Sequence, residues 1–124
     1  MKLRTFITIT AVVGLLYAVG LLFVPAFMAT TYGMGTSASE ILLARLFGGA
    51  LLALGLVQWL SRDFTGASIR PVIVGSLVGE IVGLIVALFG TLGGTMSGVG
   101  WSAVVIYLVF GLGFAYYQFM GAAK

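Results

Sequence analysis

One carboxylate lies near the middle of an apolar stretch that is long enough to cross a membrane: Glu80, within residues 71–90. A charged side chain at bilayer depth costs at least about 2 to 3 kcal/mol, so it has to face the protein interior and find a partner there. Arg45 is the candidate partner, because it lies one turn inside another apolar stretch. We therefore expect a Glu80–Arg45 ion pair inside a membrane protein.

The composition indicates that lipid is the solvent of this chain. Of its 124 residues, 61% are hydrophobic and 7% are charged, whereas about a quarter of the residues of a soluble domain are charged. Each membrane-spanning helix needs about 20 residues, and four such helices use most of the length. The sequence thus predicts an all-α integral membrane bundle of four transmembrane helices, a single domain over residues 1–124, with helices at about 5–29, 40–60, 71–91 and 101–120.

The basic residues predict the orientation. Five of the six fall on the side shared by the N-terminus, the connection between the second and third helices and the C-terminus: Lys2, Arg4, Arg62, Arg70 and Lys124. Cytoplasmic loops of membrane proteins are enriched in Lys and Arg. We therefore expect a multi-pass protein of the bacterial cytoplasmic (inner) membrane with both termini in the cytoplasm.

Several residues mark the ends of the expected helices. Pro25 is expected to kink or end the first helix, and Ser37 or Ser39 can cap the second, with Glu40 in its first turn. Aromatic side chains near helix ends are typical interfacial anchors. The expected anchors are Trp59, Trp101, Tyr116 and Tyr117.

Each expected helix contributes one polar residue near the membrane midplane, which predicts an intramembrane cluster of Glu80, Arg45, Tyr17 and Tyr107. We interpret the cluster as a structural ion pair with hydroxyl partners that fixes which helix faces which. The alternative is that Glu80 is a proton or cation site. A fixed arginine partner would oppose protonation of the carboxylate near neutral pH, which favours the structural interpretation.

Small residues recur at helix-packing spacing along the third expected helix and within the second. In the membrane, rows of small residues let two helix backbones approach closely. We interpret these residues as packing positions within one bundle, and a surface for a partner helix or a second copy is the alternative. They are Gly75, Gly79, Gly83 and Ala87, together with Gly48 and Gly49.

The residue inventory excludes several kinds of site. The chain contains no Cys and no His, so the usual ligands of zinc, copper and iron-sulfur sites and the bases of Ser-His and Cys-His catalysis are missing. We expect no metal and no required cofactor, although a bound lipid or quinone remains compatible with the sequence. The net charge of +3 forms no basic stripe, so nucleic acid is not an expected partner.

Two segments resemble a known family. The first consists of residues 21–27 and leads to Tyr32 and Gly33; the second consists of residues 42–55 and ends in the segment 59–62. Both resemble an uncharacterised family of small bacterial four-helix integral membrane proteins. The specific part of the resemblance is Ala-Arg-Leu-Phe-Gly around Arg45. The four-helix layout is also similar to that of DoxX-type membrane proteins, some of which are associated with quinone-linked sulfur oxidation. The resemblance implies a fold and a membrane location but no activity.

The sequence leaves three functions open. We expect a non-enzymatic accessory or structural subunit of a larger membrane complex or homo-oligomer, whose partners are membrane lipids and other transmembrane subunits or copies of itself. The first alternative is a small oligomeric transporter or channel that uses Glu80 and Arg45. The second is a subunit that holds a lipid or quinone tail between its helices, with the head group near Arg45 or Tyr107.

Overall fold

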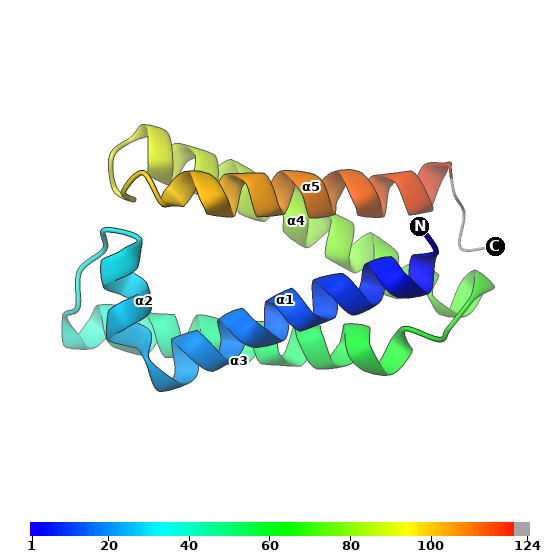
Figure 1. Cartoon of the computed structure of the whole chain (residues 1–124), viewed down its shortest axis with the longest axis horizontal. Helices are drawn as coiled ribbons and strands as arrows, with labels where there is room; N and C mark the ends of the chain where they lie inside the picture. The colour runs from blue at the N-terminus through cyan, green and yellow to red at the C-terminus, as the bar shows by residue number, and fades with distance from the viewer. Residues whose placement is uncertain (121–124) are drawn as a thin grey trace.

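The computed structural model describes residues 1–120. This part of the chain is all-α, as the sequence predicts. Its elements in chain order are α1 (Leu3–Phe23), α2 (Pro25–Thr31), α3 (Ala38–Ser61), the short 3₁₀ helix η1 (Gly66–Ser68), α4 (Arg70–Leu92) and α5 (Gly100–Phe119), shown in Figure 1.

Four of these helices, α1, α3, α4 and α5, are long and apolar enough to cross a membrane. Their outward faces carry large apolar side chains, among them Leu16, Leu43, Val86 and Leu112, each more than half exposed. Such faces suit contact with lipid tails, which are as apolar as these side chains. The expectation of four long apolar helices is confirmed.

The first expected helix is divided at Val24, so the prediction of one continuous helix over residues 5–29 is wrong, whereas the expected disruption at Pro25 is confirmed. Val24 has φ −132° and ψ 54°, outside the helical region, and Pro25 begins α2. A proline crowds the residue before it and disfavours a helical conformation there. The same ring fixes φ at a value that suits the first turn of a new helix.

The start of α3 agrees with the sequence. The Ser37 hydroxyl accepts a hydrogen bond from the Glu40 backbone N–H at 3.3 Å, and the Glu40 carboxylate accepts one from the Ser37 backbone N–H at 3.4 Å. These reciprocal bonds form a capping box that satisfies backbone donors at the helix start. Ser37 is therefore the cap.

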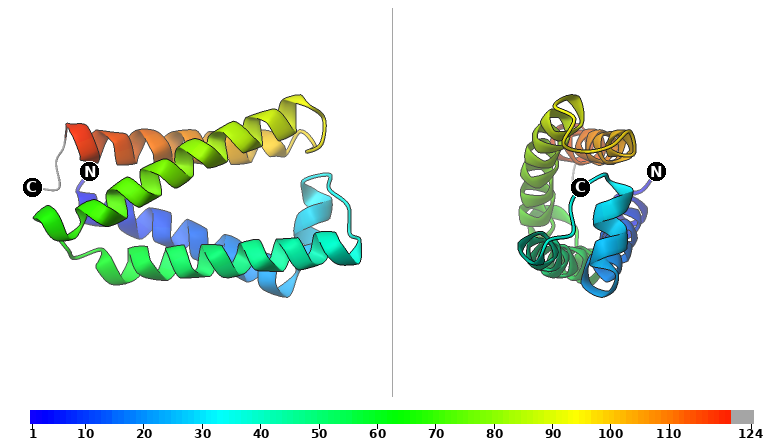
Figure 2. Two further views of the ribbon diagram at one scale, coloured as in Figure 1. Left: turned by 180° about the vertical axis from the view of Figure 1, so that it is seen from behind. Right: turned by 90° about the vertical axis from the view of Figure 1, so that its left-hand side faces the viewer.

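The four long helices associate as two antiparallel hairpins. α1 packs along α3, and α4 packs along α5, whereas few contacts join one hairpin to the other. In Figure 1 the hairpins lie close together where α1 begins and diverge toward the end that carries α2. The end-on view in Figure 2 places the four helices around a common axis.

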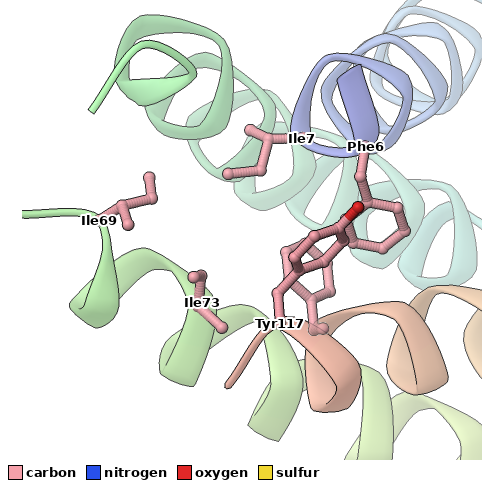
Figure 3. Close-up of a cluster of buried hydrophobic side chains, with 6 residues drawn as sticks. Phe6, Ile7, Ile69, Ile73 and Tyr117 are labelled. Atoms are coloured by element: carbon pink, nitrogen blue, oxygen red, sulfur yellow. The ribbon is translucent and has the colours of Figure 1, made fainter. Parts of the chain in front are cut away.

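The main apolar core lies at the end of the molecule where α1 begins. It joins the two hairpins and consists of Phe6, Ile7, Ile69, Ile73, Phe114 and Tyr117 (Figure 3). The Phe6 and Phe114 rings meet edge to face with their centroids 4.8 Å apart, a favoured aromatic geometry. Tyr117, one of the expected interfacial anchors, is buried in this core and donates its hydroxyl to the Met1 carbonyl.

At the opposite end, backbone contacts join α2 to the connection between α4 and α5. The Ser97 backbone N–H donates to the Tyr32 carbonyl at 2.8 Å, and the Ser97 hydroxyl donates to the Thr31 carbonyl at 3.1 Å. Figure 1 shows α2 standing between the diverging hairpins at this end. The two hairpins are thus linked at both ends of the molecule.

An exposed ion pair ties the start of α1 to the connection between α3 and α4. Arg4 Nε lies 2.5 Å from Asp63 Oδ1. The hydrogen bond from Arg4, with the charges of Arg4 and Arg62 nearby, holds the pKa of Asp63 below its ordinary value of 3.8. Because the pair is exposed, its contribution to stability is small.

Because of this pKa shift, the stability that Asp63 contributes depends on pH. A carboxylate whose pKa is lowered in the folded state stabilises the fold above its unfolded pKa, and this stabilisation is lost as the pH falls through the folded value. We expect Asp63→Asn to lower the thermal midpoint slightly at neutral pH and not at all in strong acid. Thermal melts of both proteins in mild detergent across this range test it, and a pH-independent difference would contradict it.

Candidate functional site

Glu80 lies on the buried face of α4. The buried residues of this helix are Ile73, Ser76, Glu80 and Ala87, at spacings of three, four and seven residues that keep side chains on one side of a helix. Glu80 is ten residues into a helix of 23, near its middle. The sequence pattern therefore positions the carboxylate inside the protein, near the middle of a helix long enough to span a membrane.

The Glu80 carboxylate has little exposure and lacks a polar partner. Glu80 is 9% exposed, and a Cβ placed on Gly111 of α5 would lie 3.5 Å from the Glu80 Cβ. Its Oε2 atom is buried, with no hydrogen-bond donor in range among residues 1–120. A buried polar atom without a partner costs about 1 to 3 kcal/mol, so this carboxylate does not stabilise the fold.

The expected Glu80–Arg45 ion pair is wrong. Within residues 1–120, the ion pair that forms joins Arg4 to Asp63, and Arg45 is exposed on α3. The two residues belong to different hairpins, and α3 and α4 make few contacts. Arg45 lies about 10 Å inside the start of α3, so its long side chain can extend to the membrane interface and needs no protein partner.

Tyr107 packs over α4 beside Glu80. A Cβ added to Gly83 would lie 2.2 Å from a Tyr107 ring carbon, so the ring fills the space that glycine leaves. Gly83 is one turn from Glu80 along α4. The Tyr107 side chain also lies near enough to Glu80 and to Tyr32 for their charges to interact.

Tyr17 completes this group together with Tyr32, which was not among the residues expected in the cluster. The hydroxyls of Tyr17 and Tyr32 lie 2.9 Å apart and share a hydrogen bond. Tyr32 follows α2 directly and reaches Tyr17 because the chain turns at Val24. The structure thus brings Tyr17, Tyr32 and Tyr107 together on the α2 side of Glu80, a set we call the tyrosine group.

A second polar set lies on the other side of Glu80. The Thr10 hydroxyl donates to Gln58 Oε1 at 3.1 Å, and Gln58 Nε2 donates to the Ser76 hydroxyl at 3.0 Å. All three residues are at most 3% exposed and come from α1, α3 and α4. The three residues, which we call the Gln58 network, satisfy one another and join the two hairpins, and Ser76 lies one turn from Glu80 on α4.

The expected packing residues divide into two groups. Gly48 lies against Leu21 and Leu22 of α1, and Ala87 is buried, so these positions pack within the chain as Gly83 does. Around Gly49, Gly75 and Gly79, nothing lies within 4 Å of an added Cβ. Packing within one chain is therefore wrong for these three glycines, which lie on uncovered helix faces.

The remaining expected anchors lie at helix ends. Trp101 and Tyr116 are about half exposed, near opposite ends of α5. Trp59, near the end of α3, is partly buried, with the Arg62 guanidinium carbon 4.1 Å from its ring centroid. This cation-π contact holds both side chains at the end of the molecule that also carries Arg4 and Asp63.

The chemistry open to this site is limited by its single carboxylate. No three Asp or Glu side chains come together among residues 1–120, and Glu40 and Asp63 lie at opposite ends of the molecule, away from Glu80. One carboxylate in an apolar setting can hold a proton or one cationic group.

Comparison with known proteins gives no relative: no protein-family model, no curated protein and no solved structure matches this chain. The resemblance to small bacterial four-helix membrane proteins therefore stays an expectation. Any function has to be inferred from the geometry around Glu80.

Proposed function

We propose that this chain is a small transporter or channel that works as an oligomer and binds a proton or a cationic group at Glu80. One observation carries the proposal: the buried Glu80 Oε2 has no partner in the described part of the chain. An ionisable group inside a membrane is a candidate functional site by default. Because an unpaired carboxyl group weakens the fold, a binding role explains Glu80 better than a structural role.

The neighbours of Glu80 support a path along the molecule. The tyrosine group lies toward the α2 end, and the Gln58 network lies toward the end where α1 begins. Hydroxyl and amide side chains can donate and accept hydrogen bonds. Glu80 is therefore the ionisable step between two uncharged polar segments.

We further propose that the protein resides in a bacterial cytoplasmic membrane with the start of α1 and the end of α5 facing the cytoplasm. Four basic residues lie at or beyond the helix ends on this side: Lys2, Arg4, Arg62 and Arg70. A fifth, Lys124, lies outside the described residues. The bias of Lys and Arg toward cytoplasmic loops supports this orientation.

An apolar carbodiimide tests whether Glu80 binds a proton within the membrane. Dicyclohexylcarbodiimide adds a protonated carboxyl group across one C=N bond, and the O-acylisourea so formed rearranges to a stable N-acylurea where water is excluded. We expect mass spectrometry of treated membranes to find the adduct on Glu80 and not on the exposed Glu40 and Asp63. Since the reagent consumes the protonated form, labelling should fall as pH rises.

Two comparisons define this experiment. Glu80→Gln should remove the adduct and abolish transport while expression and assembly persist, whereas Glu40→Gln should change neither. Protection of Glu80 by an added monovalent cation would identify a cation rather than a proton as the ligand. An unlabelled Glu80 in folded protein, without cation and at mildly acidic pH, would contradict the proposal.

The uncovered glycines favour a second candidate function, an accessory or structural subunit of a larger complex. Gly75 and Gly79 lie one turn apart on α4 with nothing within 4 Å of either added Cβ, which suits close approach by another transmembrane helix. The native mass after mild extraction, with every copurifying polypeptide identified, separates the candidates. A defined set of other subunits supports the accessory role, and a homo-oligomer supports the transporter.

A further inference from the structure

A cavity of about 460 Å³ lies at the end of the molecule where α1 begins, well away from Glu80. The start of α1, the connection between α3 and α4 and the end of α5 all line it. Because these are the ends of spanning helices, the cavity lies at the level of the lipid head groups. It differs in place from the lipid or quinone groove expected near Arg45 or Tyr107.

The charge of the cavity is strongly one-sided. Lys2, Arg4 and Arg62 line it together with one carboxylate, Asp63, which leaves an excess of two positive charges at neutral pH. Basic pockets between transmembrane helices at a membrane surface bind anionic head groups. The lining thus favours an anion over a cation or a neutral ligand.

The two arginines are held in place, yet they keep free donors. Arg4 contacts Asp63 through Nε alone, so its two terminal nitrogens are free of protein partners within residues 1–120. Arg62 stacks on Trp59 and donates from Nη1 to the Trp59 carbonyl at 2.5 Å. A guanidinium carries five N–H donors, and two terminal nitrogens match two phosphate oxygens.

We propose that this cavity binds a phosphate group, with Arg4 and Arg62 as its principal donors and Lys2 as an added charge. Phe64 and Tyr116 also line the cavity and offer apolar surface beside the charges. A phosphate at this level has two sources, the head group of an anionic phospholipid and a soluble phosphate. The proposal is independent of the function of Glu80.

Native mass spectrometry of the full chain in mild detergent, titrated with phosphatidylglycerol, tests the proposal, with phosphatidylcholine as the neutral-lipid reference. Each basic side chain near a membrane surface is worth about fivefold in affinity for an anionic lipid. We expect Arg4→Gln, Arg62→Gln and Lys2→Gln each to weaken phosphatidylglycerol binding by about this factor. Asp63→Asn should strengthen it, because the variant removes the one negative charge of the lining.

Arg70→Gln is the matched control, because Arg70 lies at the same end of the molecule but does not line the cavity. The affinity of the Arg70→Gln variant for phosphatidylglycerol should equal that of the wild type. Displacement of bound phosphatidylglycerol by inorganic phosphate would show that the site takes phosphate from either source, and selective lipid binding without displacement would assign it to the head group. The proposal would be overturned if Arg4→Gln and Arg70→Gln lost the same affinity for phosphatidylglycerol, or if Asp63→Asn bound this lipid more weakly than the wild type.

Discussion

Replacing Gly83 by alanine is expected to destabilise the protein by about 1 to 3 kcal/mol, the range for inserting a carbon into a packed interior. The added Cβ would lie 2.2 Å from one Tyr107 ring carbon and 2.6 Å from two others. The ring would have to move off α4 and away from Glu80. Because alanine otherwise favours a helix over glycine by about 1 kcal/mol, a loss of stability has only a steric explanation.

The same helix provides the control. Gly79→Ala meets nothing within 4 Å, so it should leave the thermal midpoint in detergent unchanged or raise it slightly. Tyr107→Ala should remove most of the penalty of Gly83→Ala, because the two changes concern one contact. Equal effects of Gly79→Ala and Gly83→Ala would show that Tyr107 does not pack over Gly83.

Local sequence patterns predicted most of the fold. The lengths of the apolar runs predicted four long apolar helices, and a serine cap with Glu40 in the first turn was predicted for the second, although the choice of Ser37 over Ser39 and the capping box came from the structure. Pro25 was recognised as a disruption, but the independent helix that follows it was not predicted. Its direction depends on the contacts of Ser97 with Thr31 and Tyr32, which join segments far apart in the chain.

The candidate site could be predicted only in part. A lone carboxylate in an apolar run was enough to place Glu80 on a buried face, because a charge at bilayer depth has to face the protein interior. The pairing of helices was not predictable from length and hydropathy, so Arg45 was assigned to a partner on the other hairpin. The core position of Tyr117 was not predicted either, because its place near a helix end says nothing about the Phe6 ring that packs on it.

Replacing Glu80 by methionine, which has a similar length and no charge, is expected to stabilise the protein by about 1 to 3 kcal/mol. The reason is that the variant removes a buried carboxyl oxygen that has no partner in the described residues. Apolar replacements of buried charged groups can be stabilising for the same reason. This gain in stability should accompany a loss of the proposed binding function.

Arg45→Gln is the second variant to measure. A Glu80–Arg45 ion pair predicts that it destabilises the protein, whereas an unpaired, exposed Arg45 predicts no change. Arg45 is exposed, and exposed substitutions usually change stability by less than about 0.5 kcal/mol. If the two residues formed a structural pair, removing either partner would destabilise the fold by about 3 to 5 kcal/mol. Single variants therefore separate the two accounts without knowledge of a ligand.

The decisive measurement is the thermal midpoint of wild type, Glu80→Met and Arg45→Gln, purified in the same mild detergent. An unpaired binding carboxylate predicts a higher midpoint for Glu80→Met and an unchanged one for Arg45→Gln. Lower midpoints for both variants, by similar amounts, would contradict this and restore a structural Glu80–Arg45 pair.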